Sequence, residues 1–132
     1  NPRLLDILYA AQRRFRAPWV VVISGYRDDR ATSRHSHGRA VDVVLPGVSD
    51  RRLAHWLTRQ GFVGVGLYTR SGFVHLDVRH SSYFWMDHSW PGQRSRPRPV
   101  FRKRAAQMDA RAKRRGQEPV PRLAALSARD EE

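Results

Sequence analysis

The sequence predicts an α+β domain in which a small antiparallel β-sheet carries helices packed on one side. The main observation is the order of its apolar segments, which alternate with turn signals as helix, strand, strand, helix, strand, strand. The last two strand segments are joined by the short turn Thr69 to Gly72, and a hairpin pairs its strands antiparallel. The length of 132 residues is that of one domain.

The first helix is expected to begin at Asn1-Pro2, because Asn is a good N-cap and Pro is favoured at the first helical position. Apolar residues from Leu4 to Phe15 then recur at helical spacing. The run Trp19 to Ile23 is expected to form a short buried strand, bounded by Pro18 and Ser24-Gly25.

The polar residues 24–38 are expected to form a loop before the second strand, Ala40 to Leu45. A second helix is predicted from Ser49, as its N-cap, to Gln60, because Gly61 ends the helical pattern. The remaining predicted strands are Phe62 to Tyr68 and Phe73 to Arg79.

Composition excludes several classes of protein. The chain has no cysteine, so disulfides, thiolate zinc fingers, iron–sulfur clusters and a cysteine nucleophile are ruled out. The longest apolar run, Ala17 to Ile23, is far shorter than the roughly 20 residues of a membrane-spanning helix. The 25 basic and 12 acidic residues give a net charge of +13.

The composition changes after Trp90-Pro91-Gly92. Residues 93–132 hold 12 basic and 5 acidic residues, and residues 92–99 offer nothing to bury. Residues 101–115 could form a basic helix, but its apolar positions are few and mostly Ala. We therefore expect a folded domain over residues 1–92 and a basic, Pro- and Arg-rich, mostly disordered tail over residues 93–132.

The basic tail raises the possibility of nonspecific nucleic-acid binding through phosphate contacts. Only Phe101 lies among its arginines, so base stacking is poorly supported. Arginine also outnumbers lysine 23 to 2 over the whole chain, a bias typical of GC-rich coding rather than of a DNA-binding surface. We therefore expect no specific nucleic-acid partner.

The fourth predicted strand places different chemistry on its two faces. Because side chains alternate along a strand, Val74, Leu76 and Val78 share one face and belong to the core. The other face carries His75 and Asp77 together with Arg79, and it is either a polar solvent face or a functional site.

Residues 33–42 read Ser-Arg-His-Ser-His-Gly-Arg-Ala-Val-Asp. Asp42 lies inside an apolar strand, where Asp is disfavoured, and a buried carboxylate must be paired or bind a metal. His35, Asp42 and His75 together make a three-ligand zinc set that leaves the fourth position open for water. The alternative is that Asp42 pairs with an arginine such as Arg27 or Arg39.

The pattern His35-x-x-Gly38-x-Ala40-x-Asp42 resembles the signature of the zinc D-Ala-D-Ala peptidases, which share a fold with lysostaphin and the hedgehog signalling domain. Ser24-Gly25-Tyr26-Arg27 and Ser33 match residues that precede that signature. Gly64 to Tyr68 followed by Phe73 to Asp77 is similar to the Gly-Val-Gly-x-Tyr and Phe-Val-His-x-Asp of the bacterial murein endopeptidases. The resemblance spans about residues 3–90.

This resemblance implies one Zn²⁺ held by His35, Asp42 and His75, with Arg27 in contact with substrate. Further candidate substrate contacts are Tyr26, Ser33 and Trp85. Tyr26 could instead pack beside a turn, and Trp85 could instead cap the core. The implied activity is zinc-dependent hydrolysis of amide bonds in peptidoglycan stem or cross-link peptides.

The chain departs from the family at the position of the usual general base, which is occupied here by Gly72. Asp77, two residues past His75, is the best substitute, since it lies on the ligand face. Alternatively, Asp77 orients a ligand or pairs with Arg79. The missing base also leaves open a zinc-holding module that binds peptidoglycan without hydrolysing it.

The chain opens at Asn1, without Met and without a signal-peptide pattern, so we expect a fragment or processed product that lacks its targeting segment. A peptidoglycan substrate implies an exported protein, periplasmic or associated with the cell wall. We expect a monomer.

Overall fold

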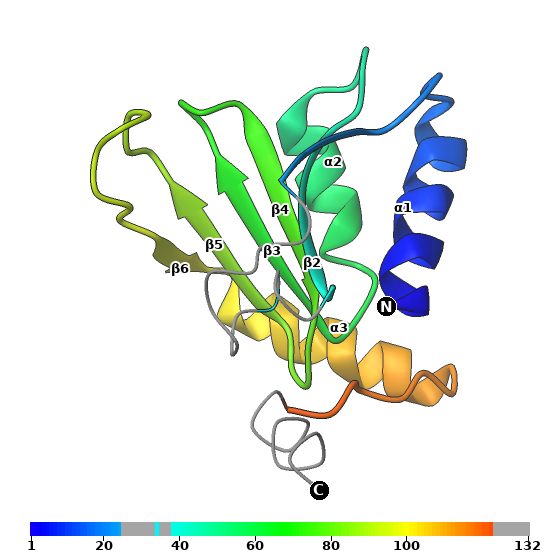
Figure 1. The fold of residues 1–132 in the computed structure, drawn as a ribbon. Coiled ribbons are helices and arrows are strands. Elements are labelled where there is room, and N and C mark those ends of the chain that lie inside the picture. The colour runs from blue at the N-terminus through cyan, green and yellow to red at the C-terminus, as the bar shows by residue number, and fades with distance from the viewer. Residues whose placement is uncertain (25–33, 35–37, 123–132) are drawn as a thin grey trace, which may run out of the picture.

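The computed structural model describes residues 1–24, 34 and 38–122. They form one six-stranded sheet, with strand order β1-β2-β4-β3-β5-β6, and three helices (Figure 1). The elements follow one another as α1 (Pro2–Phe15), β1 (Val21–Ser24), β2 (Ala40–Val44), α2 (Asp50–Leu57), β3 (Val63–Tyr68), β4 (Phe73–Val78), β5 (Tyr83–Asp87), β6 (Arg98–Val100) and α3 (Arg102–Arg114).

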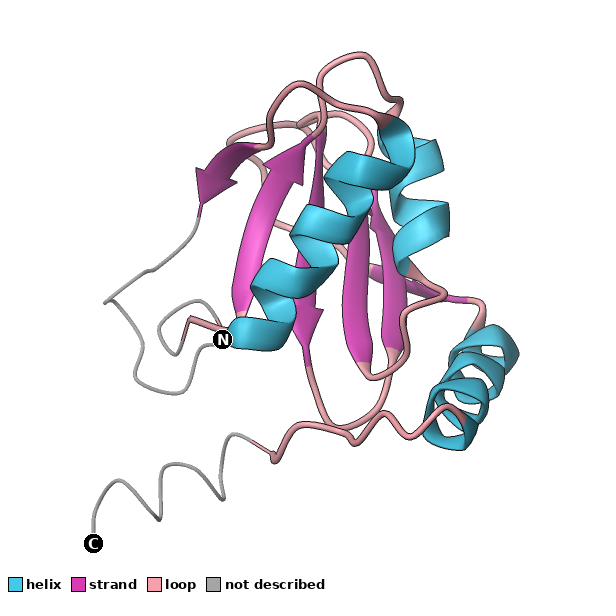
Figure 2. Cartoon of the chain, turned by 90° about the vertical axis from the view of Figure 1, so that its right-hand side faces the viewer, coloured by secondary structure: helices cyan, strands magenta, loops and turns pink. Residues whose placement is uncertain are grey.

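Helices α1 and α2 lie against one face of the sheet, and the apolar core fills the space between the two layers (Figure 2). Both helices begin where the sequence predicts. Asn1 Oδ1 accepts a hydrogen bond from the Arg3 backbone N–H at 2.8 Å, and Ser49 Oγ accepts one from Arg52 at 3.2 Å. These caps satisfy backbone donors that a helix start leaves unpaired.

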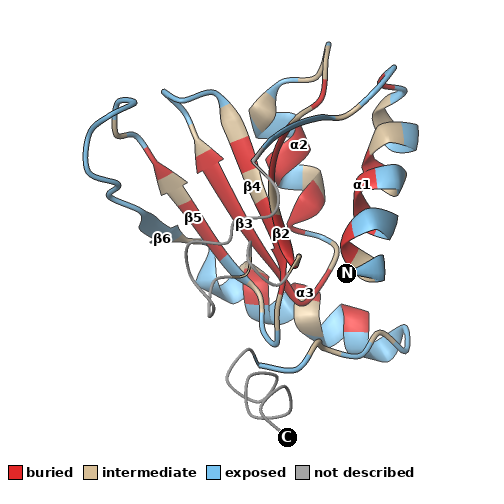
Figure 3. Cartoon of the chain, in the orientation of Figure 1, coloured by how far each residue is buried: buried red, intermediate tan, exposed pale blue. Residues whose placement is uncertain are grey.

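Strand β4 lies in the middle of the sheet, antiparallel to β2 on one side and to β3 on the other. Val74, Leu76 and Val78 are completely buried in the core, which confirms the predicted face. Figure 3 shows that burial is concentrated on these central strands and on the sides of the helices that cover them.

The sheet is mixed rather than antiparallel as predicted, because β5 pairs with β3 in parallel. After β4 the chain crosses to the far side of β3, so β5 does not pair with the strand that precedes it in the sequence. The prediction of a buried first strand is also wrong. Strand β1 lies at the sheet edge, and Val22 and Ile23 are about half exposed, at 51% and 54%.

The expectation of a mostly disordered tail is corrected for residues 98–114. Strand β6 extends the sheet beyond β5, and α3 packs against the domain through a buried stripe of small or flexible side chains. Ala112 of that stripe fits against Gly61, where a Cβ atom would overlap it. The predicted boundary at residue 92 therefore does not separate β6 and α3 from the sheet, and residues 123–132 lie outside the described part.

Asp109 joins α3 to the sheet by hydrogen bonds that local sequence does not indicate. Its carboxylate accepts from the backbone N–H groups of Phe62 and Ser82, both at 2.7 Å. Among the described residues, no helix is long and apolar enough to cross a membrane.

Candidate active site

Residues of the predicted motifs lie in one row across the sheet. Asp42 on β2 is directly opposite His75 on β4, and His75 is opposite Gly66 on β3. The row continues to Ser24 on β1 at one end and to Trp85 on β5 at the other. Directly opposed residues share a face and lie close together, so strand pairing unites segments that are far apart in the sequence.

Asp42 and His75 meet at hydrogen-bond distance, with 3.0 Å between Asp42 Oδ1 and His75 Nδ1. Asp42 is buried, at 5% exposed, as a carboxylate with a partner can be. Of the arginines considered as alternative partners, Arg39 instead donates to the Pro121 carbonyl at 2.6 Å. Arg27 lies outside the described residues.

Asp77 contacts the second ring nitrogen of the same histidine. His75 Nε2 is 2.7 Å from Asp77 Oδ2, and Asp77 itself is completely buried. Arg79 holds both carboxylate oxygens, with its Nε on Oδ1 and an Nη on Oδ2, each at 2.6 Å. Arg34 adds a further cationic contact at 3.6 Å. The carboxylate thus lies between an imidazole and a bidentate guanidinium.

These contacts shift the pKa values of Asp77 and His75. Burial alone would raise the pKa of Asp77, but hydrogen bonds and charge from His75 and Arg79 outweigh it and hold the pKa far below its ordinary value. Burial lowers the pKa of His75, whereas hydrogen bonds to Asp42 and Asp77 raise it, and the net pKa lies above the ordinary value. A general base works best with a pKa near the working pH, so Asp77 is better suited to hold the imidazole than to accept a proton.

Two glycines on β3 make room for this cluster. A Cβ atom on Gly64 would overlap the carboxylate of Asp77, and one on Gly66 would overlap the ring of Trp85. The Trp85 ring lies over His75, with 5.1 Å between ring centroids, and its Nε1–H donates to the Tyr68 hydroxyl at 3.1 Å. Gly64 and Gly66 therefore occupy positions of β3 where any side chain would overlap the cluster.

The arrangement fits a metal ion between Asp42 and His75. An imidazole between two carboxylates must carry a proton on both nitrogens unless a cation lies on one side. Two ligands of one tetrahedral zinc, each about 2.0–2.2 Å from it, are roughly 3.3 Å apart, close to the separation observed here. A histidine whose other nitrogen donates to a carboxylate is the usual form of a metal-bound imidazole.

The structure brings together only some of the predicted site residues. Asp42, His75, Asp77 and Trp85 form one cluster, whereas His35, Arg27, Tyr26 and Ser33 lie outside the described residues. Within the described ranges, no three His, Asp or Glu side chains are placed to hold a metal ion together.

The sequence did not indicate the steric part played by Gly64 and Gly66, or the contact of Arg34 with Asp77. A signal for the glycines was present, since Gly inside a strand often marks the close approach of another group. No local pattern could have placed Arg34, because its contact joins a loop residue to a strand.

A histidine held between two buried carboxylates in the middle of an α+β sheet is a candidate hydrolase site. The chain belongs to the peptidase M15 family, whose sequence profile matches residues 1–77. This confirms the resemblance found in the sequence motifs. No solved structure gives a significant match to the chain.

The chain is similar to the peptidoglycan L,D-endopeptidase MepK of Escherichia coli K12 and to the protein of the same name in Shigella flexneri. Each is 40% identical over 95 residues, which cover 59% of this chain and 50% of the relative. The chain therefore spans about half the length of the curated relatives it matches.

Proposed function

We propose that this protein is a zinc-dependent peptidase that hydrolyses amide bonds in the stem or cross-link peptides of peptidoglycan. The proposal includes a hedgehog- or D-Ala-D-Ala peptidase-like fold, and a monomer exported to the periplasm or cell wall. Membership of the peptidase M15 family and the name of the relatives support it. The observation that carries it is the 3.0 Å approach of Asp42 Oδ1 to His75 Nδ1 on two central strands.

We assign His35, Asp42 and His75 as the ligands of one Zn²⁺. Bound there, zinc would polarise the scissile carbonyl and lower the pKa of a water molecule to about 7. Asp77 accepts the Nε2–H of His75 and so keeps Nδ1 as the nitrogen that faces Asp42. Arg27, from the family motif, would hold a substrate carboxylate through its planar guanidinium.

Asp77 is assigned as a positioning residue rather than as the general base. Its burial, its bidentate bond to Arg79 and its depressed pKa all favour a carboxylate that stays charged and fixed. Trp85 covers His75 and limits the access of water to the imidazole from that side. These residues give the ligand a single orientation before substrate arrives.

The function is tested by incubating purified peptidoglycan with the protein and analysing the released muropeptides. We expect cleavage of peptide bonds that a chelator abolishes and zinc restores. The variant His75→Ala should be inactive, whereas the exposed His80→Ala should retain activity and serves as the matched control. Release of the same fragments by wild type and His75→Ala would contradict the proposal.

The second candidate is a zinc-holding module that binds peptidoglycan without cleaving it. It is favoured by Gly72, which stands where the family has its base and which adopts a φ of +78° in the turn between β3 and β4. This candidate predicts zinc in the purified protein and sedimentation with peptidoglycan, but no released muropeptide at any zinc concentration.

A further inference from the structure

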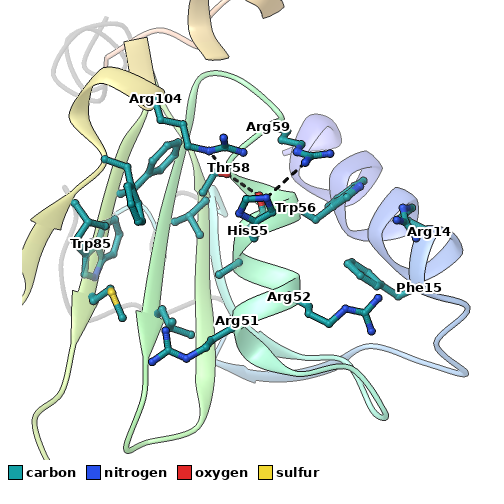
Figure 4. A pocket seen from close by; sticks show the side chains of 17 residues that line it. Arg14, Phe15, Arg51, Arg52, His55, Trp56, Thr58, Arg59, Trp85 and Arg104 are labelled. Carbon is teal, nitrogen blue, oxygen red and sulfur yellow. Dashed lines mark hydrogen bonds between the residues drawn. The ribbon is translucent and has the colours of Figure 1, made fainter. Parts of the chain in front are cut away.

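A cavity of about 660 Å³ lies on the helix face of the sheet, between α2 and the segment formed by β5, β6 and the start of α3 (Figure 4). This volume is within the range of 300–1,000 Å³ that is usual for small-molecule sites. Its floor is apolar and comes from the core side of three strands: Val65, Leu67, Phe84, Met86 and Val100.

The rim of the cavity is cationic. Among the described residues that line it there is no carboxylate, and its arginines form no ion pair with any carboxylate of the described chain. Arg52 lies over the ring of Phe15, and Arg59 contacts the ring of His55, so these cations are held at the rim by rings rather than by carboxylates. The cationic residues are Arg14, Arg51, Arg52, Arg59 and Arg104.

Arg104 contributes a donor that lacks an acceptor. Its Nε donates to Thr58 Oγ1 at 3.0 Å, which fixes the guanidinium beside the cavity (Figure 4). One of its Nη atoms is buried and has no hydrogen-bond partner among the described residues. An unsatisfied buried donor is unfavourable, and the guanidinium that carries it borders the cavity.

The cavity is separate from the candidate active site. Val65 and Phe84 are paired across β3 and β5, and the next pair along the same strands is Gly66 and Trp85. Because side chains alternate along a strand, the first pair faces the helices and the second faces His75. A ligand in this cavity would therefore lie on the opposite side of the sheet from the zinc site proposed above.

We propose that this cavity binds an amphiphilic anion, a molecule with an apolar chain or ring that bears a carboxylate or phosphate group. The apolar part lies on Leu67, Phe84 and Met86. The anionic group pairs with the guanidinium of Arg104 and with the exposed arginines of α2, since guanidinium binds such groups bidentately. A neutral ligand would leave these arginines unpaired, and a cation would be repelled.

The proposal is tested by titrating the purified full chain with four probes of equal chain length, each below its micelle concentration. These are laurate, dodecyl phosphate, dodecanol and dodecyltrimethylammonium, and calorimetry together with tryptophan fluorescence reports binding, because Trp56 lines the cavity. We expect one site per chain for both anions, with an affinity at least about tenfold above that for dodecanol.

The double variant Arg51→Gln/Arg59→Gln should weaken binding of laurate by about tenfold or more, and Arg104→Lys should weaken it while keeping the charge. The matched control Arg111→Gln/Lys113→Gln removes the same charge from exposed residues of α3 that do not line the cavity. It should bind laurate like the wild type. Circular dichroism of each variant establishes that the chain is folded.

Several results would overturn the proposal. Equal binding of dodecanol and laurate would show that the cavity does not require a negative charge. Equal binding of inorganic phosphate and laurate would show that it does not require an apolar chain. An equal loss of laurate binding in the α3 control would show a general effect of charge. Binding to phosphatidylglycerol vesicles without binding of the dispersed probes would show a membrane-surface contact instead of a cavity site.

Discussion

Strand β4 carries completely buried residues on both of its faces, but with opposite chemistry. On the helix face, Leu76 is completely buried among apolar side chains that fill space without directional bonds. On the other face Asp77 is equally buried, yet both its oxygens are engaged by His75 and Arg79. The stability of the first face depends on how well its side chains fill the space, whereas that of the second depends on the identity of each bonded partner. Substitutions on the two faces should therefore have different effects.

The largest effect on stability is expected for Asp77→Ala. This change removes the carboxylate that both Arg79 and His75 Nε2 contact, and breaking a buried ion pair costs about 3–5 kcal/mol. It should also weaken zinc binding by about 10–100-fold, because His75 loses the group that orients it. Urea denaturation and zinc titration measure the two effects. A variant that kept wild-type zinc affinity would refute the positioning role.

The apolar face should show a loss of stability without a change in the site. Leu76→Ala leaves a cavity in the core and is expected to lower the free energy of unfolding by about 3 kcal/mol. Its folded fraction should bind zinc with the wild-type affinity, since Leu76 points away from the metal ligands. Weaker zinc binding by the folded protein would show that the two faces are not independent.

A smaller effect is expected where β3 makes room for the polar face. Gly66→Ala places a methyl group against the ring of Trp85, and such overpacking typically costs about 1–3 kcal/mol. The displacement should change the tryptophan fluorescence, because Trp85 lies over His75. Gly47→Ala is the control, since nothing lies near that Cβ, although its φ of +80° adds backbone strain. Unchanged fluorescence in Gly66→Ala would contradict the packing argument.

The smallest predicted effect is a pH dependence of the metal-free protein. Burial lowers the pKa of His75 but hydrogen bonds to Asp42 and Asp77 raise it further, so its pKa is higher in the folded than in the unfolded chain. The stability that this proton contributes is present below the unfolded pKa of about 6.5 and is lost as the pH rises through the folded pKa.

We therefore expect the free energy of unfolding, measured in a chelator, to fall as the pH is raised above about 6.5. Zinc should oppose this trend, because a metal ligand must be deprotonated. In His75→Gln the trend should be weaker, since the titrating group is absent. An identical slope in the variant would assign the dependence to other groups.

Local periodicity explains how much of the fold could be predicted. Helices α1 and α2 are each marked by an N-cap and an apolar stripe. Strands β2, β3 and β4 are each marked by a short apolar run, so single segments were sufficient to predict all five elements. Strand β5 was missed because its pairing with β3 is parallel and skips β4, which no local pattern indicates. Helix α3 is polar by composition, and it packs because Ala112 fits the space left by Gly61.

The candidate site likewise combines features that local sequence predicts with features that depend on contacts between distant segments. Asp42 and His75 could be paired from a motif and from strand alternation, and the structure places them directly opposite each other. Asp77 was left with two roles, because sequence gives its face but not its hydrogen bonds. The structure shows that Arg79 bonds to both of its oxygens, which supports the proposal that Asp77 orients His75.

The central claim is that Asp42 and His75 bind the same metal ion. The most direct measurement is the zinc content of protein purified after saturation with zinc and removal of the excess, for wild type, Asp42→Ala, His75→Ala and the control His80→Ala. The structure predicts about one zinc per chain in the wild type and the control, and a loss of zinc from both ligand variants. Equal zinc in all four proteins would contradict it.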